Sequence, residues 1–291
     1  MAKIGFDIGG TNIAAGLISD EGTLLKKGSL PFPQDKDFEK VLSTCEQLVK
    51  ALEEGIEPVE SVGVAVPGSL DASASVVLNA FNLGFCNTPL KGILSERLGK
   101  KVFLINDADA AVLAEHRIGS LKGCKDAFMI TLGTGLGGGL ILNDKLYRGG
   151  RGHGSEPGHL ILYNGGRRCT CGNDGCAECY CSATRLVTDG KTYGWTTAKA
   201  VIDAAKAGDE FATAIFNKYV DDISSYLASI INLLDPERIA IGGGVSAAGD
   251  FLMTPIRENT WRKVFFNERT DIVIATAGND AGIYGAAFIA E

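Results

Sequence analysis

Five of the chain's eight cysteines lie within thirteen positions, in the stretch CTCGNDGCAECYC that begins at Cys169. Cys171 and Cys176 flank a tight G-N-D-G turn, and His159 precedes Cys169 by ten residues. Three thiolates and one imidazole are the ligand set of a closed zinc site of the structural type. The spacing therefore predicts a zinc ion that braces a loop. A four-cysteine site without His159 and a set of disulfide bonds are the alternatives.

The stretch D-I-G-G-T-N, which begins at Asp7, has the composition of a phosphate-binding loop. Gly9 and Gly10 would let backbone N–H groups approach a phosphate, and Thr11 and Asn12 add side-chain donors. Asp7, at the end of an expected strand, can hold a magnesium ion directly or through water. The alternative is a tight hairpin that needs positive φ at glycine.

Two more glycine runs follow expected strands. The run L-G-T-G-L-G-G-G, with Gly133, Thr134 and Gly135, has G-x-G-x-x-G spacing, but it continues as an apolar strand where a dinucleotide-binding fold needs a helix. The run I-G-G-G-V-S, with Gly243 and Gly244, would let a flat ring lie against the backbone, or is a simple strand-to-helix turn. Three such loops together indicate a nucleoside triphosphate site.

Carboxylates supply the candidate acid–base groups. Asp107 ends the stretch I-N-D, where a strand meets a helix, and could accept a hydroxyl proton while Asn106 orients the substrate. Helix capping is the alternative role for this pair, and Asp109 is the competing base. Glu156 and Glu178 lie on either side of the expected metal, which would fix both as acceptors for hydroxyls; otherwise they are solvated surface acids.

The elements that position these residues alternate between β-branched runs and helical patterns, which is typical of an α/β fold. Apolar residues recur at helical spacing from Phe38 to Leu52 and along Phe211–Leu234. Six stretches are expected to be strands: Lys3–Asp7, Ser61–Val66, Val102–Ile105, Phe128–Leu132, Arg238–Ile241 and Asp271–Ala275.

A weak internal repeat divides the chain. A shift of 124 positions aligns I-G-G-T at Ile8 with L-G-T-G at Leu132, and G-L-I-S-D at Gly16 with L-I-L-N-D at Leu140. Each copy opens with a strand, a glycine turn and a second strand. The repeat predicts two related halves whose glycine loops face each other across a cleft.

The bulk composition is that of an ordinary folded protein. The 291 residues are 45% apolar and 22% charged, with 28 basic and 35 acidic side chains and a net charge of −7. An acidic chain is a poor ligand for nucleic acid or an anionic membrane, and no apolar run is long enough to span a bilayer. We therefore expect no nucleic-acid or membrane partner and a cytoplasmic location.

The ordered motifs resemble those of the ROK family of sugar kinases (repressor, open reading frame, kinase) from Ile4 to Ala287. The matching stretches are the three glycine runs, V-P-G at 66–68, F-N-L-G-F at 81–85, I-N-D-A-D-A-A at 105–111, E-P-G-H at 156–159, C-T-C-G-N-D-G-C-A-E at 169–178 and G-N-D-A-G-I-Y-G-A-A at 278–287.

This resemblance implies an actin-like ATPase fold, with two RNase H-like α/β domains and the active site in the cleft between them. We expect an N-terminal α/β domain at 1–117, completed by a C-terminal helix at 280–291, and a C-terminal α/β domain with the zinc loop at 118–279. The implied activity is ATP-dependent phosphorylation of a hexose 6-hydroxyl, with glucose as the first choice and a homodimer as the assembly. Alternatives are a kinase for N-acetylmannosamine, N-acetylglucosamine, allose or fructose, or a non-catalytic sugar-responsive regulator.

The resemblance also implies roles for individual residues. Asp107 would be the catalytic base, Asp7 would serve Mg²⁺-bound phosphates, Gly133–Gly135 would form the second phosphate loop, and the glycines at 242–244 would lie near the adenosine of ATP. The implied sugar ligands are Gly68, Asn82, Asn106, Asp107, Glu156, His159 and Glu178. The implied ligands of a structural Zn²⁺ are His159, Cys169, Cys171 and Cys176.

The chain departs from the family pattern at two places. Gly154-Ser155-Glu156 stands where the family usually has A-G-E, and Cys179 and Cys181 are atypical thiols near the expected zinc. Family members that repress transcription carry a winged-helix domain before the first glycine loop. Here that loop begins at Asp7, so we expect no such domain.

Overall fold

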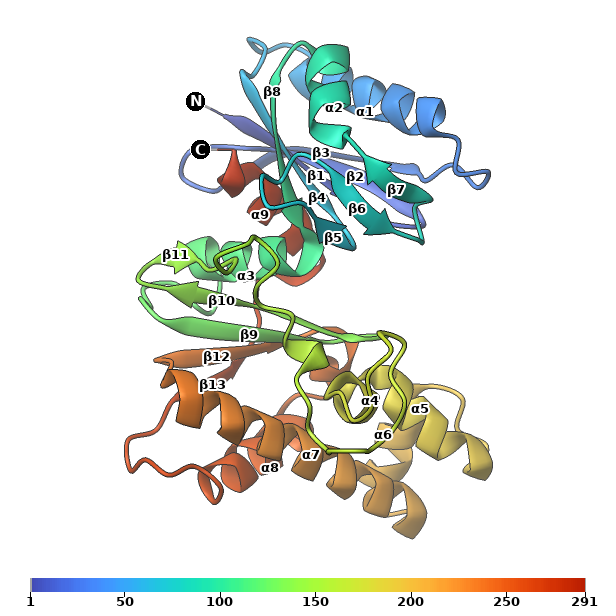
Figure 1. Cartoon of the computed structure of the whole chain (residues 1–291), viewed down its shortest axis with the longest axis vertical. Helices are drawn as coiled ribbons and strands as arrows, with labels where there is room; N and C mark the ends of the chain where they lie inside the picture. Colours follow the sequence, from blue (N-terminus) through green and yellow to red (C-terminus); the bar gives the residue numbers. More distant parts are fainter. Residues whose placement is uncertain (1, 291) are drawn as a thin grey trace. The chain divides into compact units, whose positions relative to one another are not determined.

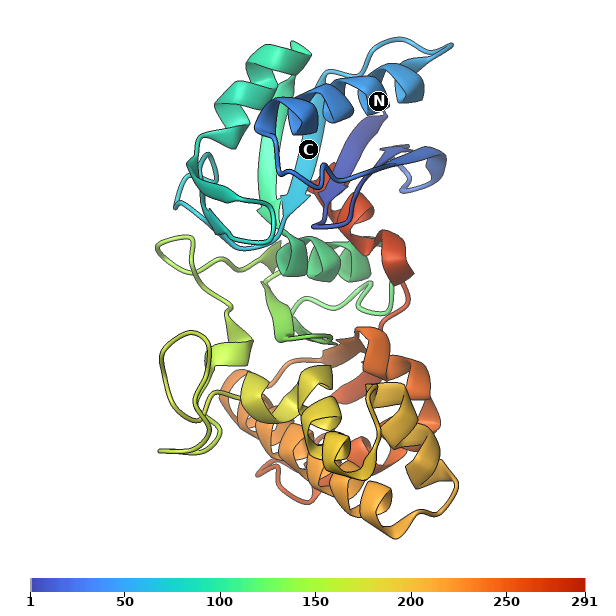
Figure 2. The same cartoon turned by 90° about the vertical axis from the view of Figure 1, so that its right-hand side faces the viewer.

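The computed structural model describes residues 2–290, which form two compact units (Figures 1 and 2). The first unit extends to Gly123 and also contains Leu146–Ser155 and the chain from Ala277 onward. The second unit contains Cys124–Lys145 and Glu156–Thr276. Each unit has its own five-stranded mixed sheet and its own hydrophobic core.

The sheet of the first unit contains β1 (Lys3–Ile8), β2 (Asn12–Ile18), β3 (Leu24–Pro31), β4 (Ser61–Val66) and β8 (Lys101–Asn106). Their order is β3-β2-β1-β4-β8. β1 and β2 form an antiparallel hairpin, whereas β1, β4 and β8 are parallel. β4 has five consecutive buried residues, as expected for a central strand that is covered on both faces, and the edge strand β3 alternates between half-buried and exposed residues.

Helices cover both faces of this sheet. α1 (Phe38–Glu53) and α2 (Leu90–Leu98) lie on one face, and α3 (Asp107–Ile118) and α9 (Ala281–Ile289) lie on the other (Figure 1). α1 begins after Asp37, whose carboxylate accepts a hydrogen bond from the Lys40 N–H (3.1 Å). Its apolar side chains then recur at helical spacing and are buried against the sheet.

α9 packs so closely on β1 and β4 that both strands need glycine. A β-carbon at Gly63 would lie 1.6 Å from the Ala286 carbonyl oxygen, and one at Gly5 would lie 1.9 Å from the Ile283 carbonyl oxygen. The two glycines therefore allow a helix that is distant in sequence to complete the core of the first unit.

The first unit also contains a small antiparallel sheet of β5 (Ser69–Leu70), β6 (Val77–Ala80) and β7 (Phe85–Thr88), in that order. The sequence patterns did not predict it, because strands of two to four residues are too short to show an alternating pattern.

The sheet of the second unit contains β9 (Ala127–Leu132), β10 (Leu136–Leu142), β11 (Lys145–Leu146), β12 (Arg238–Gly242) and β13 (Asp271–Ile274). The order is β11-β10-β9-β12-β13, with an antiparallel β9–β10 hairpin and parallel β9, β12 and β13. This arrangement matches β3-β2-β1-β4-β8 strand for strand. The predicted repeat of a strand, a glycine turn and a second strand is confirmed.

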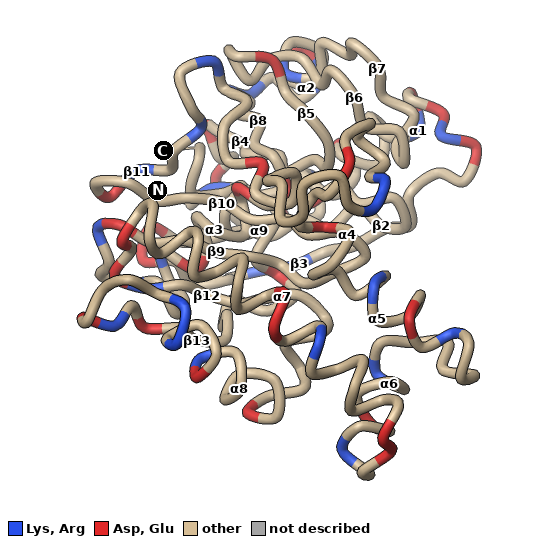
Figure 3. Tube along the Cα trace, turned by 60° about the horizontal axis from the view of Figure 1, so that its bottom comes forward, with Lys and Arg blue, Asp and Glu red and all other residues tan. Residues whose placement is uncertain are grey.

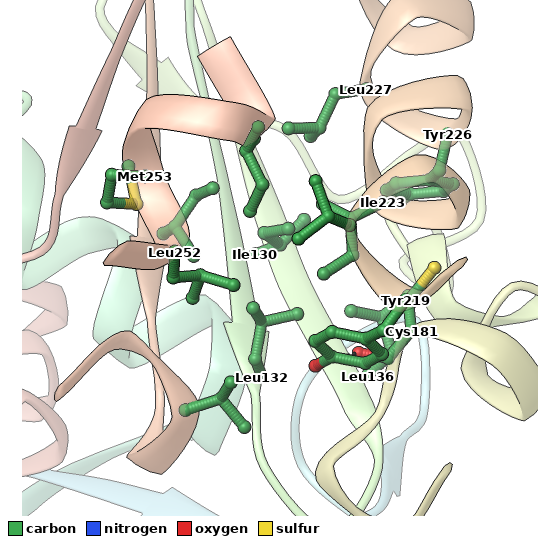
Figure 4. Packing of buried hydrophobic residues seen from close by; sticks show 14 of the residues in the cluster. Ile130, Leu132, Leu136, Cys181, Tyr219, Ile223, Tyr226, Leu227, Leu252 and Met253 are labelled. Atoms are coloured by element: carbon green, nitrogen blue, oxygen red, sulfur yellow. Dashed lines mark hydrogen bonds between the residues drawn. The ribbon is translucent and has the colours of Figure 1, made fainter. Parts of the chain in front are cut away.

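The main helices of the second unit are α5 (Ala183–Gly190), α6 (Ala198–Lys206), α7 (Glu210–Leu234) and α8 (Asp250–Trp261), which lie on one face of its sheet (Figure 1). Figure 4 shows Ile223 and Leu227 of α7 packed near Ile130 of β9 and Leu252 of α8. The long helix expected from its apolar pattern is therefore the central packing element of this unit.

The expected strands and long helices are present with ends that differ by at most a few residues. The compact units differ from the expected division into 1–117 with 280–291 and 118–279. The structure divides after Gly123, begins the returning segment at Ala277 and adds Leu146–Ser155 to the first unit. The added segment belongs there because Gly152 packs on Ala72 and Arg148 faces Asp109.

Candidate active site

Asp7 and Asp107 lie at the same edge of the first unit's sheet. Asp7 is near the end of β1, and Asp107 directly follows β8. β4 lies between them, with Ala65 paired to Asp7 and Val66 paired to Asn106. Because the three strands are parallel, their carboxyl ends meet at one edge, where ligands bind in open α/β sheets.

The loop after β1 exposes backbone groups beside Asp7. Neither Gly9 nor Gly10 has a positive φ, so the explanation that the hairpin needs glycine for its conformation is wrong. Gly10, Thr11 and Asn12 are exposed. A β-carbon at Gly10 would lie 3.6 Å from the Asn82 side-chain nitrogen, so Asn82 is adjacent to the loop. Glycine here keeps N–H groups accessible to an anion.

Two neighbouring carboxylates act on Asp7 at this edge. Burial, and the negative charges of Asp107 and Asp280, raise the pKa of Asp7 to about 6. Asp107 is exposed, but the surrounding protein reduces its hydration, which raises its pKa. A hydrogen bond from the Ala108 N–H (2.9 Å) lowers the pKa in part. A divalent cation beside Asp7 would offset this repulsion, so the donor set fits Mg²⁺.

Asn106 fixes the start of α3. Its side-chain oxygen accepts hydrogen bonds from the N–H groups of Ala108 (2.8 Å) and Asp109 (3.3 Å), and its side-chain nitrogen donates to the Gly68 carbonyl (2.8 Å). Gly68 has φ +89°, and a β-carbon there would lie 1.8 Å from the Asn79 carbonyl oxygen. The capping role is thus present, and contact between Asn106 and a substrate stays a prediction.

The competing base, Asp109, is in a different environment. It is buried in the first turn of α3, and its carboxylate lies 3.7 Å from the Arg148 Nε. A buried carboxylate that faces a guanidinium is a poor acceptor for a substrate proton. The structure therefore favours Asp107 over Asp109.

In the second unit, the second glycine loop joins β9 to β10, as the continuing apolar strand predicted. The loop is held by residues that follow the cysteine stretch. The Ala183 N–H donates to the Gly133 carbonyl (2.7 Å), and the Thr184 hydroxyl donates to the Thr134 carbonyl (2.6 Å). No motif in the sequence indicated Thr184.

Glu178 makes a third connection to this loop from α4 (Glu178–Cys181). Its Oε2 accepts a hydrogen bond from the Leu136 N–H (3.0 Å). A β-carbon at Gly135 would lie 2.3 Å from the same oxygen, so glycine is needed for the carboxylate to approach. Its other oxygen lies 4.0 Å from the Cys169 sulfur.

The third glycine run packs at the base of the second loop. Gly243 has φ +83°, and a β-carbon there would lie 2.5 Å from the Leu132 carbonyl oxygen. Gly244 begins η3 (Gly244–Ala248) and borders a cavity of about 250 Å³. Apolar and charged side chains line the cavity, among them Ile202, Val245, Ala248, Lys199, Asp203 and Lys206. Its size and apolar wall suit a flat heteroaromatic ring.

His159, Cys169, Cys171 and Cys176 place one ligand atom each within 4.8 Å of one another. The Cys169 sulfur is 3.8 Å from His159 Nδ1, and the Cys171 and Cys176 sulfurs are 3.6 Å apart. A tetrahedral zinc ion with bonds of about 2.0–2.3 Å separates its ligand atoms by roughly 3.5–3.8 Å. Burial raises the pKa of Cys169, but hydrogen bonds with these neighbours lower it to about 7, which favours the thiolate. The residues fit a structural zinc ion.

Of the two extra cysteines, Cys179 contacts the four-ligand group through Cys169, whereas Cys181 lies in the core. All eight cysteines are free, so the disulfide alternative is not supported. Cys181 is buried beside Tyr219 (Figure 4), whose hydroxyl donates to the Cys181 carbonyl (2.8 Å). The half-buried Cys179 donates to the Arg168 carbonyl (3.6 Å). Neither thiol is needed to complete the four-ligand group.

Glu156 is exposed and directly precedes η1 (Pro157–His159). Ser155 before it has φ +67°, and its hydroxyl is buried without a hydrogen-bond partner in the described chain. Glycine, the usual family residue at this position, would adopt this left-handed conformation without strain. Ser155 therefore has a strained backbone conformation directly before Glu156, a candidate sugar ligand.

Asp280 is a site residue that the sequence reasoning missed. It lies directly before α9, and its carboxylate accepts a hydrogen bond from Lys27 Nζ (2.5 Å). The motif G-N-D-A-G at 278–282 contains it, but only the fold brings it near Asp7.

The sequence pattern that defines the ROK family matches residues 3–291. The chain belongs to the ROK family. This ROK protein is 36% identical to the glucokinase of Thermotoga maritima, over 98% of this chain and 96% of that protein. It is 31% identical to the N-acetylmannosamine kinase of Haemophilus influenzae, over 99% of this chain and 95% of that protein.

Two solved structures of ROK proteins resemble this one over their full lengths. The ROK hexokinase from Thermus thermophilus has a TM-score of 0.92 and 34% identity, with 100% of this chain and 98% of that chain covered. The ROK family glucokinase from Streptomyces griseus, in complex with glucose and AMPPNP, has a TM-score of 0.83 and 34% identity, with 100% and 99% covered. The expected actin-like ATPase fold is confirmed.

The charges of this ROK protein are mixed along the chain. Figure 3 shows Lys and Arg residues interspersed with Asp and Glu residues on most elements. Among residues 2–290, no helix is long and apolar enough to cross a bilayer.

Proposed function

We propose that this ROK protein is an ATP-dependent glucokinase that transfers the γ-phosphoryl group of ATP to the 6-hydroxyl of glucose. The observation that carries the proposal is the position of Asp7 and Asp107 at one sheet edge, beside a glycine loop with exposed backbone. A full-length relative named glucokinase and a ROK glucokinase solved with glucose and AMPPNP support it.

Asp107 acts as the general base in this proposal. It accepts the hydroxyl proton while the sugar oxygen forms a bond to the γ-phosphorus and the bond from that phosphorus to the ADP oxygen breaks. Its raised pKa makes it a stronger base than an ordinary aspartate, and the Asn106 cap fixes its backbone. Mg²⁺, when held at Asp7, neutralises charge on the phosphates.

The other ligands follow from the loops. The first loop (Gly9, Gly10, Thr11, Asn12) and the second loop (Gly133, Thr134, Gly135) bind the phosphates of ATP, and the cavity beside Gly243 and Gly244 takes the adenine. The sugar hydroxyls are bound by Gly68, Asn82, Asn106, Glu156, His159 and Glu178.

Zinc bound by His159, Cys169, Cys171 and Cys176 braces the loop that carries the sugar ligands. Metal analysis of the purified protein tests this part: Cys171→Ser should lose zinc, whereas the control Cys179→Ser should keep one zinc per chain. Equal zinc content in both variants would show that the ligand set is wrong.

The deciding experiment is an ADP-release assay across a hexose panel, with ATP, GTP and polyphosphate as donors. We expect glucose and ATP to be preferred, and Asp107→Asn to abolish turnover while glucose still binds by calorimetry. Activity restricted to N-acetylmannosamine would favour the kinase class of the Haemophilus relative. An active Asp107→Asn variant would exclude Asp107 as the base.

Two further parts of the proposal are tested separately. A gel shift with DNA tests the alternative of a non-catalytic regulator. We expect this protein not to bind DNA. The homodimer, which rests on the family resemblance alone, is tested by light scattering.

A further inference from the structure

A cavity of about 400 Å³ in the second unit uses none of the glycine-loop residues or zinc ligands. It lies among the loop after η1, α4, α5 and α7, and we name it the arginine pocket. The side chains that define it are Tyr163, Arg167, Tyr180, Arg185, Lys218 and Asp222. Cavities of roughly 300–1,000 Å³ are typical of small-molecule sites.

Both carboxylates that line the arginine pocket are already engaged. Asp189 accepts a hydrogen bond from Arg185 Nε (2.5 Å), one turn away on α5, and its second oxygen faces Arg185 Nη2. Asp222 accepts hydrogen bonds from the Tyr163 hydroxyl (2.5 Å) and from the Lys218 ammonium group. These pairs leave neither carboxylate free to neutralise a third cation.

Arg167 is that third cation. In the described chain no carboxylate lies within ion-pair distance of it, and its one side-chain hydrogen bond is a long contact to the Cys179 carbonyl (3.4 Å). Burial, and then the positive charge of Arg167, lower the pKa of Arg185 to about 10. Two guanidinium groups thus repel each other in a partly desolvated cavity, and an anion between them would relieve that repulsion.

Aromatic rings form an ordered wall of the same cavity. The Tyr163 and Tyr180 rings lie 4.6 Å apart between centroids, with Arg167 4.8 Å from the centre of the Tyr180 ring and Lys218 5.0 Å from the centre of the Tyr163 ring. The Tyr180 hydroxyl also accepts a hydrogen bond from the Arg167 N–H (2.7 Å). These contacts hold the cations and the rings in place before any ligand binds.

We propose that the arginine pocket binds a small phosphomonoester, with its phosphate on Arg167 beside Arg185 and its organic group against Tyr163. Guanidinium groups match phosphate oxygens in bidentate geometry, and Arg167, which has no carboxylate partner in the described chain, can offer this geometry in full. The Arg185 Nε and Nη2 groups face Asp189, so Arg185 contributes its remaining N–H groups. Tyr163, whose side chain is exposed, offers an apolar surface for the rest of the molecule, and the buried Tyr180 supports it from behind. This binding is independent of the proposed kinase reaction.

Isothermal titration calorimetry with the zinc-loaded protein tests the proposal. Saturating glucose and AMPPNP fill the proposed catalytic site, and glucose 6-phosphate or inorganic phosphate is then titrated. We expect glucose 6-phosphate to bind at one site and more tightly than inorganic phosphate. Arg167→Gln and Arg185→Gln should each weaken its binding roughly ten- to a hundredfold, since each removes a hydrogen bond to a charged group.

Arg168→Gln is the matched control, because Arg168 is adjacent in sequence but its exposed side chain pairs with Asp174 outside the cavity. This variant should bind as the wild type does, and thermal melts verify that each variant is folded. Arg167 is exposed, so its replacement should not disturb the core. Wild-type affinity in Arg167→Gln, no binding by the wild type, or equal affinity for inorganic phosphate would each overturn the proposal.

Discussion

The Glu178 carboxylate accepts a hydrogen bond from the Leu136 N–H and also lies 4.0 Å from the Cys169 sulfur. One side chain therefore contacts both the second glycine loop and a candidate zinc ligand. A displacement of the cysteine loop would move the loop that is proposed to bind phosphate. Glu178 thus has a positioning role in addition to the sugar contact that the family resemblance implies.

Two substitutions separate these roles of Glu178. Glu178→Gln keeps an oxygen for the Leu136 N–H but loses the charge, so we expect the KM for glucose to rise roughly tenfold and the KM for ATP to stay unchanged. Glu178→Ala loses both the oxygen and the charge, so it should raise the KM for glucose and the KM for ATP. Steady-state kinetics with each substrate varied in turn measures the difference, and equal effects of the two variants on the KM for ATP would contradict the positioning role.

Asp7 should make the metal-free protein less stable as the pH rises. Its pKa is about 6 in the folded protein and near 3.8 when the chain is unfolded, so the folded state binds the proton more tightly. The resulting stabilisation is present below about pH 4 and is lost as the pH rises through 6. Two pKa units correspond to about 3 kcal/mol, an upper limit for a group that is not fully buried.

Asp7→Asn tests this effect directly. In the presence of a chelator, the variant should have a higher free energy of unfolding than the wild type at pH 8 and nearly the same value at pH 4, while its turnover is lost. Urea denaturation at the two pH values gives the comparison. A variant that is less stable than the wild type at pH 8 would show that the carboxylate is not repelled at this site.

Gly63→Ala should severely destabilise the first unit. The added methyl group would lie 1.6 Å from the Ala286 carbonyl oxygen, so α9 must move away from β4. We expect a loss of about 3 kcal/mol in the free energy of unfolding. The control is Gly92→Ala in α2, where, in the described chain, an added β-carbon would have no atom within 4 Å outside the helix backbone. Alanine there should raise the free energy of unfolding by up to about 1 kcal/mol. Similar melting temperatures for the two variants would contradict the close contact of α9.

Ser155→Gly should stabilise the protein. A non-glycine residue at φ +67° costs about 1–3 kcal/mol, which exceeds the roughly 0.5–1 kcal/mol of backbone entropy that glycine loses on folding. We expect the free energy of unfolding to rise by about 1 kcal/mol. Ser155→Ala removes the buried hydroxyl but keeps the strained φ, so it separates the two contributions in urea denaturation. No gain from Ser155→Gly would mean that the loop is unstrained.

Much of the site could be predicted from sequence because its residues follow strands. Asp7 is the last residue but one of β1 and Asp107 follows β8, and parallel strands bring their ends together whatever the exact packing. The grouping of the candidate zinc ligands was predictable for a related reason, since Cys169, Cys171 and Cys176 lie close in sequence and only His159 must be brought to them.

Contacts between segments that are distant in sequence could not be predicted. Asp280 influences Asp7 only because α9 returns to β1, and the motif that contains it does not state where it lies. Thr184 holds the second glycine loop through a backbone carbonyl, a contact that any residue at position 134 could provide. Arg148 joins the first unit through Asp109, which sequence spacing does not indicate.

The place of α9 also sets an order of events on the ribosome. β1 is synthesised first, but the helix that covers it, Ala281–Ile289, emerges some 270 residues later. At a synthesis rate of about 5–20 residues per second, β1 is made roughly 15–60 s before α9 is available to cover it. β13, the last strand of the second unit, ends at Ile274, so most of that unit is also synthesised while the sheet of the first unit still lacks α9. Chaperone binding during synthesis is therefore expected at the N-terminal sheet.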